Sequence, residues 1–178
     1  MKARAALRAG TAAEHEAVDR LFAGLDLARP DDYFRFLTAQ ATAFVPVEHA
    51  LEAAGVEQLV ADWPARRRAH LLRQDLNGLG APLPEPEPVP VLAGTAETLG
   101  ALYVLEGSRL GGAMLKRTVS TEMPQAFLSA PQPPGSWRKL LETLDHYLYE
   151  TASIEAAVGA ARRVFHCFEA GGRRFLES

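Results

Sequence analysis

The chain has 178 residues, of which 48% are hydrophobic and 23% charged, and its formal net charge is -3. This length suits one domain with a sizeable core, so we expect residues 1–178 to form a single domain. The near-balanced charge supplies no global field that would attract nucleic acid, which excludes nucleic acid as an expected partner.

Cysteine content and the distribution of charge indicate the cellular compartment. Cys167 is the only cysteine, so neither an internal disulfide nor a cysteine-rich zinc site can form. The first twenty residues carry charges throughout, and no later apolar run approaches about 18 residues. We therefore expect a cytoplasmic protein with no secretion signal and no membrane span.

The hydrophobic pattern predicts helices along most of the chain. Apolar residues near the start recur close to every 3.6 positions, which predicts a first helix over residues 4–23. A second helix begins where Asp31 or Asp32 can cap it, contains Pro46 and ends at Gly55. The remaining predicted helices cover residues 64–76, a segment that starts at Thr95, residues 136–151 and residues 154–174.

The other segments predict connections rather than strands. Residues 81–91, APLPEPEPVPV, contain too many prolines for a helix or a central strand and predict an extended connector. The alternation of strands and helices that is typical of a nucleotide-binding sheet is missing. The predicted fold class is therefore all-α.

His15 is the one histidine whose surroundings indicate a ligand site. It lies on or beside the apolar stripe of the first predicted helix, and Asp19 follows one turn later. A histidine that binds iron through one nitrogen usually donates its other N–H to a carboxylate, a carbonyl or water. The competing interpretation is a surface pair at i,i+4, worth a few tenths of a kcal/mol, and spacing alone favours that pair. His166 beside Cys167 is a weaker alternative ligand pair.

Glycines at 107, 111 and 112 interrupt the predicted helix that starts at Thr95. Each glycine inside a helix lowers the stability of that helix by about 0.5 to 1 kcal/mol relative to alanine. The presence of three glycines here therefore requires an explanation. A kinked helix whose bare backbone approaches a flat ligand is one reason, and a close crossing of two helices is the other. The spacing of the glycines does not decide between them. A phosphate-binding loop fits poorly, because no strand precedes the segment and its lysine and Ser/Thr are missing.

Two further side chains are candidates for the rim and wall of such a ligand site. Arg8, one to two turns before His15, can pair with a carboxylate at the edge of a ligand, although a solvated arginine is the ordinary interpretation. Phe165 on the last helix belongs to an apolar face, so it can serve the core, the pocket wall or both.

The segment TAAEH that ends at His15, together with LYVLEGSRLGG about ninety residues later, resembles the heme oxygenase family, particularly its bacterial branch. The resemblance implies a single all-helical domain in which haem lies between the first helix and a glycine-kinked distal helix. It assigns His15 as the axial ligand of the haem iron. The same resemblance gives the distal role, with contact to haem, to Gly107, Ser108, Gly111 and Gly112; it makes Gly107 and Ser108 the catalytic positions, and it places Asp19, Arg8 and Phe165 around the haem.

The reaction that the resemblance implies converts haem, O2 and supplied electrons into biliverdin, CO and Fe2+, so that haem is both cofactor and substrate. A separate reductase or a ferredoxin is the expected electron donor, because the chain has no flavin or nicotinamide fingerprint. A phytochrome is a further candidate partner that would accept biliverdin. The protein's own part is to hold haem, restrict its orientation and order water.

The sequence departs from part of the family at position 108. Some members carry an aspartate that organises the distal water, whereas this chain has Ser108, which can orient water but cannot act as a strong acid or base at neutral pH. Two alternatives therefore stay open: a haem-binding sensor or carrier of the same fold that does not degrade haem, and a helical interaction module in which the glycines serve packing.

Overall fold

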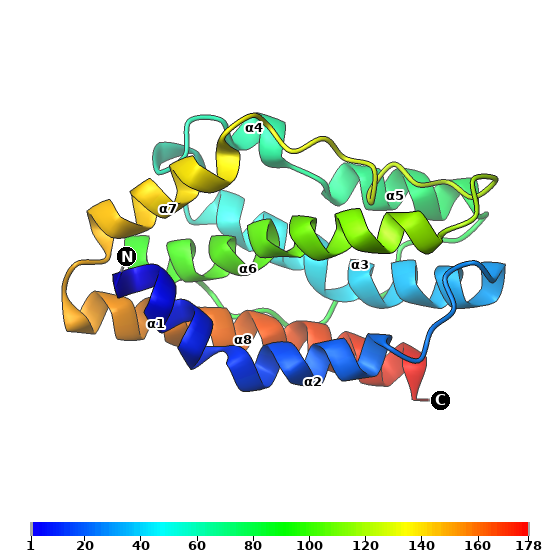
Figure 1. The fold of residues 1–178 in the computed structure, drawn as a ribbon, viewed down its shortest axis with the longest axis horizontal. Coiled ribbons are helices and arrows are strands. Elements are labelled where there is room, and N and C mark those ends of the chain that lie inside the picture. The colour runs from blue at the N-terminus through cyan, green and yellow to red at the C-terminus, as the bar shows by residue number, and fades with distance from the viewer. Residues whose placement is uncertain (1, 178) are drawn as a thin grey trace.

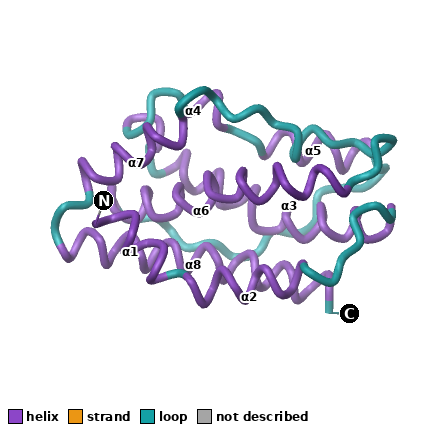
Figure 2. Tube along the Cα trace, in the orientation of Figure 1, coloured by secondary structure: helices purple, strands orange, loops and turns teal. Residues whose placement is uncertain are grey.

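The computed structural model describes residues 2–177, so Met1 and Ser178, the ends of the expected single domain, lie outside the described residues. Every regular element in this range is helical, which confirms the all-α prediction (Figures 1 and 2). None of these helices combines the length and apolar character that a membrane crossing needs. The helices are α1 (Lys2–Gly10), α2 (Ala12–Phe22), α3 (Pro30–Ala53), α4 (Trp63–Arg66), α5 (Ala69–Gly78), α6 (Gly94–Leu115), α7 (Ser136–Tyr147) and α8 (Thr151–Leu176), with short 3-10 turns at Val56–Gln58 and Lys116–Thr118.

The first predicted helix is two helices, because the chain bends at Thr11 between α1 and α2. Gly10 lies so close to α8 that an added Cβ would meet Cγ1 of Val158 at 2.5 Å. The Thr11 hydroxyl donates to the carbonyl oxygen of Leu7 at 2.7 Å, which satisfies backbone at the bend. The prediction of one continuous helix over residues 4–23 was therefore wrong at this point.

The third predicted helix is also divided, into α4 and α5. The buried carboxylate of Glu48 accepts hydrogen bonds from the backbone N–H groups of Arg68 at 2.8 Å and Ala69 at 3.2 Å. These bonds take the place of a side-chain cap and start α5 at a position that local sequence does not indicate.

Helix α3 begins two or three residues earlier than the prediction of a cap at Asp31 or Asp32 required. Arg29 occupies the N-cap position and Pro30 the first turn, so neither Asp31 nor Asp32 is the cap. The Asp32 carboxylate instead accepts a hydrogen bond from the backbone N–H of Asp26 at 2.9 Å. The connector over residues 81–91 has no regular secondary structure, as predicted.

Helix α8 contacts α1, α2, α3 and α6, and it runs alongside α1 and α2 in Figure 1. The buried apolar side chains form one continuous core that runs from Ala3 to Phe168. Two glycines allow the backbones to approach closely: a Cβ on Gly100 would overlap the carbonyl oxygen of Ala157, and a Cβ on Gly171 would overlap the Thr42 hydroxyl. The close helix crossings of this fold therefore use glycines other than those at 107 and 111.

We expect Gly100→Ala to lower the free energy of unfolding by about 1 to 3 kcal/mol, because the added methyl must push α6 away from the α8 backbone. Urea denaturation followed by circular dichroism measures this change. Unchanged stability would show that the α6–α8 crossing is looser than the structure places it.

Candidate functional site

His15 lies on the exposed side of α2 and is held from two directions. Its Nδ1 donates to Oδ2 of Asp19 across 3.0 Å, and its side chain is 61% exposed. The ring meets the Phe165 ring edge-on, with 5.6 Å between the centroids. Because Nδ1 carries the hydrogen bond to the carboxylate, Nε2 is the nitrogen that remains for a metal or a ligand. The contact between Asp19 and His15 belongs to both interpretations of the sequence, support of a ligand and a surface pair, so it does not by itself decide between them.

Helix α6 passes through the glycine segment without a break, so the glycines do not divide it into two helices. Built Cβ atoms on Gly107 and Gly111 would meet no atom within 4 Å. A tight helix crossing would place a neighbour there, so the packing interpretation fails for these two glycines. Gly112 differs, because its added Cβ would meet Leu128 at 3.4 Å. The structure brings Gly107 and Gly111 to one open face and turns Gly112 toward the loop that carries Leu128.

The N-terminal helices and α6 approach each other at both ends of this open face. At one end, burial raises the pKa of Tyr103 of α6, and the positive charges of Arg4 and Arg8 of α1 act against this rise. At the other end, Phe22 of α2 and Leu115 of α6 line a common cavity of about 230 Å³. Along the chain, His15 falls between Arg8 and Phe22, and Gly107 and Gly111 fall between Tyr103 and Leu115, so both groups lie on the stretch between the two ends.

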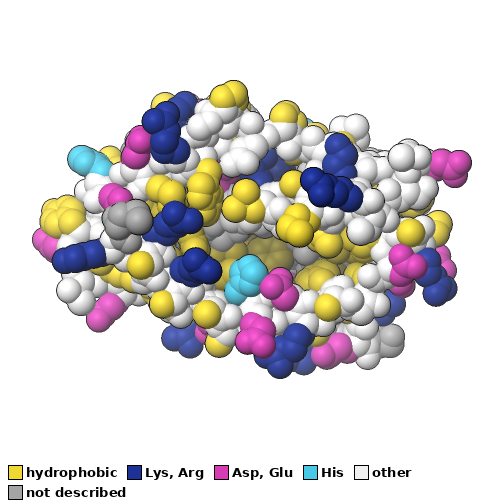
Figure 3. Space-filling view, in the orientation of Figure 1, with side chains coloured by type: hydrophobic (Ala, Val, Ile, Leu, Met, Phe, Trp, Pro, Cys, Tyr) yellow, Lys and Arg dark blue, Asp and Glu magenta, His cyan; other side chains and the backbone are white. Residues whose placement is uncertain are grey.

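We call the gap between α2 and α6 the α2–α6 crevice, bounded by His15, Phe165, Gly107 and Gly111. Figure 3 shows hydrophobic side chains in a hollow along the middle of this face of the molecule. Val18, Phe22 and Leu25 are half-buried and pack against the core nearby. The crevice therefore combines an apolar lining, an exposed imidazole and a bare stretch of helix backbone, which suits a flat apolar ligand with a metal at its centre.

Ser108 lies beside the crevice, but its hydroxyl is turned toward the protein. The hydroxyl donates to the carbonyl oxygen of Leu105 at 2.6 Å and accepts from Nη2 of Arg68 at 3.0 Å. A serine oxygen has one proton and two lone pairs, so one lone pair remains for water. The hydroxyl can therefore take part in a water network only as an acceptor in this arrangement.

A buried group of charges underlies this part of α6, and sequence reasoning missed it. Glu106 accepts hydrogen bonds from Nη1 of Arg66 at 2.9 Å and from Nε of Arg109 at 3.2 Å. Arg68 lies over the rings of Phe44 and Phe127, and burial and the nearby Arg109 lower its pKa. The sequence signal for this buried ion pair was the presence of Glu106 and Arg109, three residues apart, inside the apolar run LYVLEGSRLGG.

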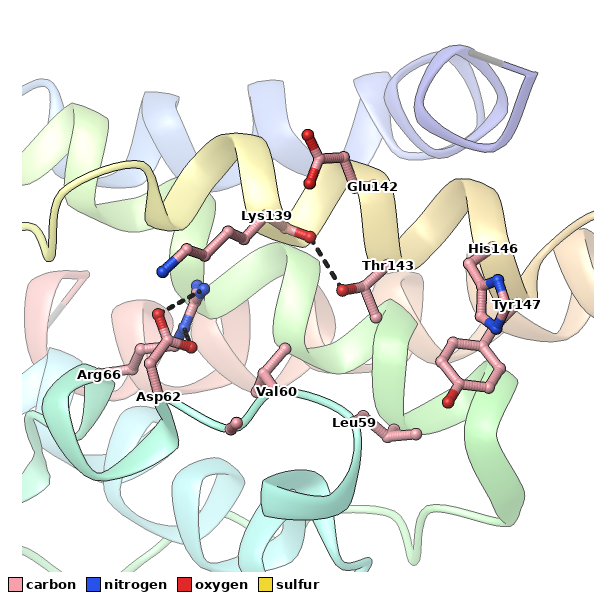
Figure 4. A pocket seen from close by; sticks show the side chains of 10 residues that line it. Leu59, Val60, Asp62, Arg66, Lys139, Glu142, Thr143, His146 and Tyr147 are labelled. Atoms are coloured by element: carbon pink, nitrogen blue, oxygen red, sulfur yellow. Dashed lines mark hydrogen bonds and ion pairs between the residues drawn. The ribbon is translucent and has the colours of Figure 1, made fainter.

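A second, more voluminous cavity lies away from the crevice. It has a volume of about 560 Å³ and lies between the loop before α4 and the outer side of α7 (Figure 4). Asp62, Arg66, Lys139 and His146 are among its lining residues, and His15 and the glycines are not. We take the α2–α6 crevice as the candidate site, because it combines the Nε2 atom of His15 with the open helix backbone at Gly107 and Gly111.

Known proteins similar to this chain share one function. The heme oxygenase of Xanthomonas campestris pv. campestris (strain 8004) is 31% identical over 147 residues, which cover 74% of this chain and 88% of that protein. The heme oxygenase PigA of Pseudomonas aeruginosa is 32% identical over 144 residues, which cover 75% and 73%.

A solved structure agrees with these sequence matches. The NO- and CO-bound heme oxygenase from Neisseria meningitidis superposes with a TM-score of 0.81 and 28% identity over 96% of this chain and 90% of that one. No family model matches.

The chain belongs to the heme oxygenase family. This confirms the resemblance on which the sequence prediction rested, and with it the heme oxygenase fold and the oxidative degradation of haem to biliverdin. The residues of the crevice fit haem, because the imidazole of His15 stands free at Nε2 and a side chain at 107 or 111 would occupy space that is open. The sensor, carrier and helical-module alternatives have no support in these comparisons.

We expect Gly107→Ala in this heme oxygenase to raise the stability of the haem-free protein by about 0.5 to 1 kcal/mol, because alanine is the better helix former and meets no neighbour. The same methyl enters the crevice and should weaken haem binding. Urea denaturation and haem titration by absorbance measure the two effects. A destabilised variant with unchanged haem affinity would place Gly107 in a packing contact instead.

Proposed function

We propose that the α2–α6 crevice is the haem site, with Nε2 of His15 as the axial ligand of the iron and Gly107 and Gly111 on the opposite side. The observation that carries this proposal is the pairing of a free imidazole nitrogen with two glycines whose missing side chains leave open space. The roles that we propose below for the other predicted site residues follow from this position of the haem.

Bound haem supplies the iron at which O2 is activated and the ring carbon that is oxidised. The protein's residues supply position. Asp19 accepts the Nδ1 proton of His15, which fixes the tautomer and makes the imidazole a stronger donor. The Phe165 edge limits rotation of the same ring. The apolar lining excludes bulk water, so that few water molecules reach the reacting side.

On the distal side, we assign to Gly107 and Ser108 the positioning of water and O2. Glycine at 107 keeps a side chain away from the space above the iron, and the remaining lone pair of the Ser108 oxygen can accept from one water molecule. Gly111 extends the open face, whereas Gly112 supports the segment from the side of Leu128. Ser108 thus acts as an orienting group and not as an acid.

We propose that Arg8 binds a haem propionate at the Tyr103 end of the crevice. Arg8 has no acidic partner among residues 2–177, so its charge is available to a ligand carboxylate. For electrons we propose a separate reductase or a ferredoxin, in keeping with the lack of a nucleotide-binding fingerprint in the sequence. A phytochrome as acceptor of biliverdin and a cytoplasmic location stay predictions from the sequence.

We expect His15→Ala to abolish the haem spectrum of a histidine-ligated complex and the formation of biliverdin, because His15 supplies the imidazole of the proposed site. The fold should persist, since His15 is mostly exposed. Absorbance on haem addition, and biliverdin release with O2 and reductant, measure the two losses. His146→Ala, on the exposed side of α7, is the control. A native spectrum in His15→Ala would overturn the ligand assignment.

We expect Asp19→Asn to weaken haem binding by about tenfold, because an amide is a poorer acceptor for the Nδ1 proton and leaves the imidazole less basic. Haem titration measures the change, and the Fe–His vibration of the ferrous complex should move to lower frequency. Glu16→Gln removes an exposed carboxylate from the same helix without touching His15 and serves as the matched control. Equal behaviour of the two variants would show that Asp19 is only a surface partner.

A further inference from the structure

The two halves of α6 are held in different ways. The first half packs tightly, since Gly100 lies against the α8 backbone and Leu99, Ala101 and Leu102 are fully buried. Beyond Arg109 the helix has little apolar cover: Leu110 is 52% exposed and Met114 is 73% exposed. Apolar packing therefore does not determine where the glycine segment lies over the crevice.

A buried network of charges holds the helix where that packing ends. The Glu106 carboxylate is divided between Arg66, through Oε2, and Arg109, through Oε1. Arg109 also donates from Nη2 to the Arg66 carbonyl oxygen and from Nη1 to the carbonyl oxygen of Pro131 at 3.4 Å. The three side chains are almost completely buried. We call them the Glu106 triad.

The triad joins α6 to two other parts of the molecule. Arg66 belongs to α4, and its Nη2 donates to the carbonyl oxygen of Ser136, the first residue of α7, at 3.0 Å. Arg66 also donates from Nε to Oδ1 of Asp62 at 2.7 Å, on the wall of the cavity beside α7 that Figure 4 shows. The middle of α6 is thereby tied to α4 and to the start of α7 by directional bonds.

Arg68 adds a second connection on the neighbouring side of α6. It donates from Nη2 to the Leu105 carbonyl oxygen at 2.6 Å and to the Ser108 hydroxyl. Glu48 holds the Arg68 backbone in place. The Glu106 triad and Arg68 both contact α6 next to Gly107. Neither contacts α6 beyond Arg109, so they hold the later residues only through the helix itself.

Buried ion pairs are poor stabilisers, because desolvation offsets most of their attraction, and apolar groups of similar volume often replace them without loss. Their bonds are directional, however, and a charge that loses its partner has no alternative position in the interior. A charge network at the point of α6 where apolar packing ends is therefore better explained by the position it enforces than by stability.

We propose that Glu106 and Arg109, anchored by Arg66, are positioning residues that set the distance of the 107–112 backbone from the haem site. This inference rests on the proposed haem site, yet its first consequence concerns the haem-free protein. Loss of the triad frees the C-terminal half of α6, so that the space above the iron becomes wider and less defined.

The direct test is hydrogen–deuterium exchange of the haem-free protein. Arg109→Met keeps an unbranched apolar stem and removes the three hydrogen bonds that Arg109 donates, so the amides of residues 107–118 should exchange about tenfold faster than in the wild type. Arg109→Lys retains the charge and should recover part of the protection. Leu51→Ala, a core substitution in α3 of a fully buried residue, is the control for general destabilisation and should leave this segment's relative protection unchanged.

A second measurement uses the haem-bound protein. The CO dissociation rate of the ferrous complex should rise about tenfold in Arg109→Met, since a loosened distal helix restrains the bound diatomic less, and stay near the wild-type rate in Leu51→Ala. Failure of the wild type to bind haem would overturn the proposed function while leaving the exchange result to stand on its own.

Two outcomes would overturn the positioning role: folded Arg109→Met with wild-type exchange over residues 107–118, or the same acceleration in Leu51→Ala. If Arg109→Met does not fold, Glu106→Gln replaces it. That variant keeps the side-chain volume and one acceptor, so it should fold, and its exchange over residues 107–118 should lie above the wild type. Wild-type protection in Glu106→Gln would then refute the proposal.

Discussion

The carboxylate of Glu106, shared between two buried arginines, is the interaction on which the arrangement of the crevice depends. It lies at the point of α6 where apolar packing ends and the open glycine face begins. Without a directional contact at this point, the C-terminal half of α6, which has little apolar cover, would have no defined position over the crevice. The fold therefore combines a well-packed first half of α6 with a second half that is held by charge.

The opposite wall of the crevice is built on a different principle. His15 is fixed by Asp19 within its own helix and by Phe165 of α8, so its orientation needs only one local contact and one tertiary contact. The bend at Thr11 separates α2 from α1, with Gly10 close against α8. One wall thus takes its geometry from a short local unit, and the other from a network that spans four segments of the chain.

The difference between the two walls explains which site residues were predictable. A histidine and an aspartate at i,i+4 meet on any α-helix, so the pair followed from spacing and the structure contains it. Gly107 and Gly111 were recognised as unusual, but spacing could not distinguish an open face from a helix crossing. The crossings turned out to use Gly100 and Gly171, and their partners come from distant parts of the chain.

The contacts of Ser108 show more clearly what could not be predicted from the sequence. The sequence indicated a hydroxyl that could order water, whereas Arg68, forty residues away, already engages that hydroxyl. The division of the predicted helix over residues 64–76 has the same origin, since Glu48 of α3 supplies the bonds that start α5. Contacts of this kind join residues that no local pattern relates.

The sequence by itself determined the all-helical class, most helix positions, the His15–Asp19 pair and the family. These depend on periodicity, on spacing within one helix, and on two motifs whose order and separation are read directly. Only the tertiary structure decided that Gly107 and Gly111 face open space and that Gly112 does not. It alone also decided that Arg66, Arg68 and Arg109 are buried around Glu106. The physical reason is that burial, and the partner a charge finds when buried, depend on which distant segments pack together.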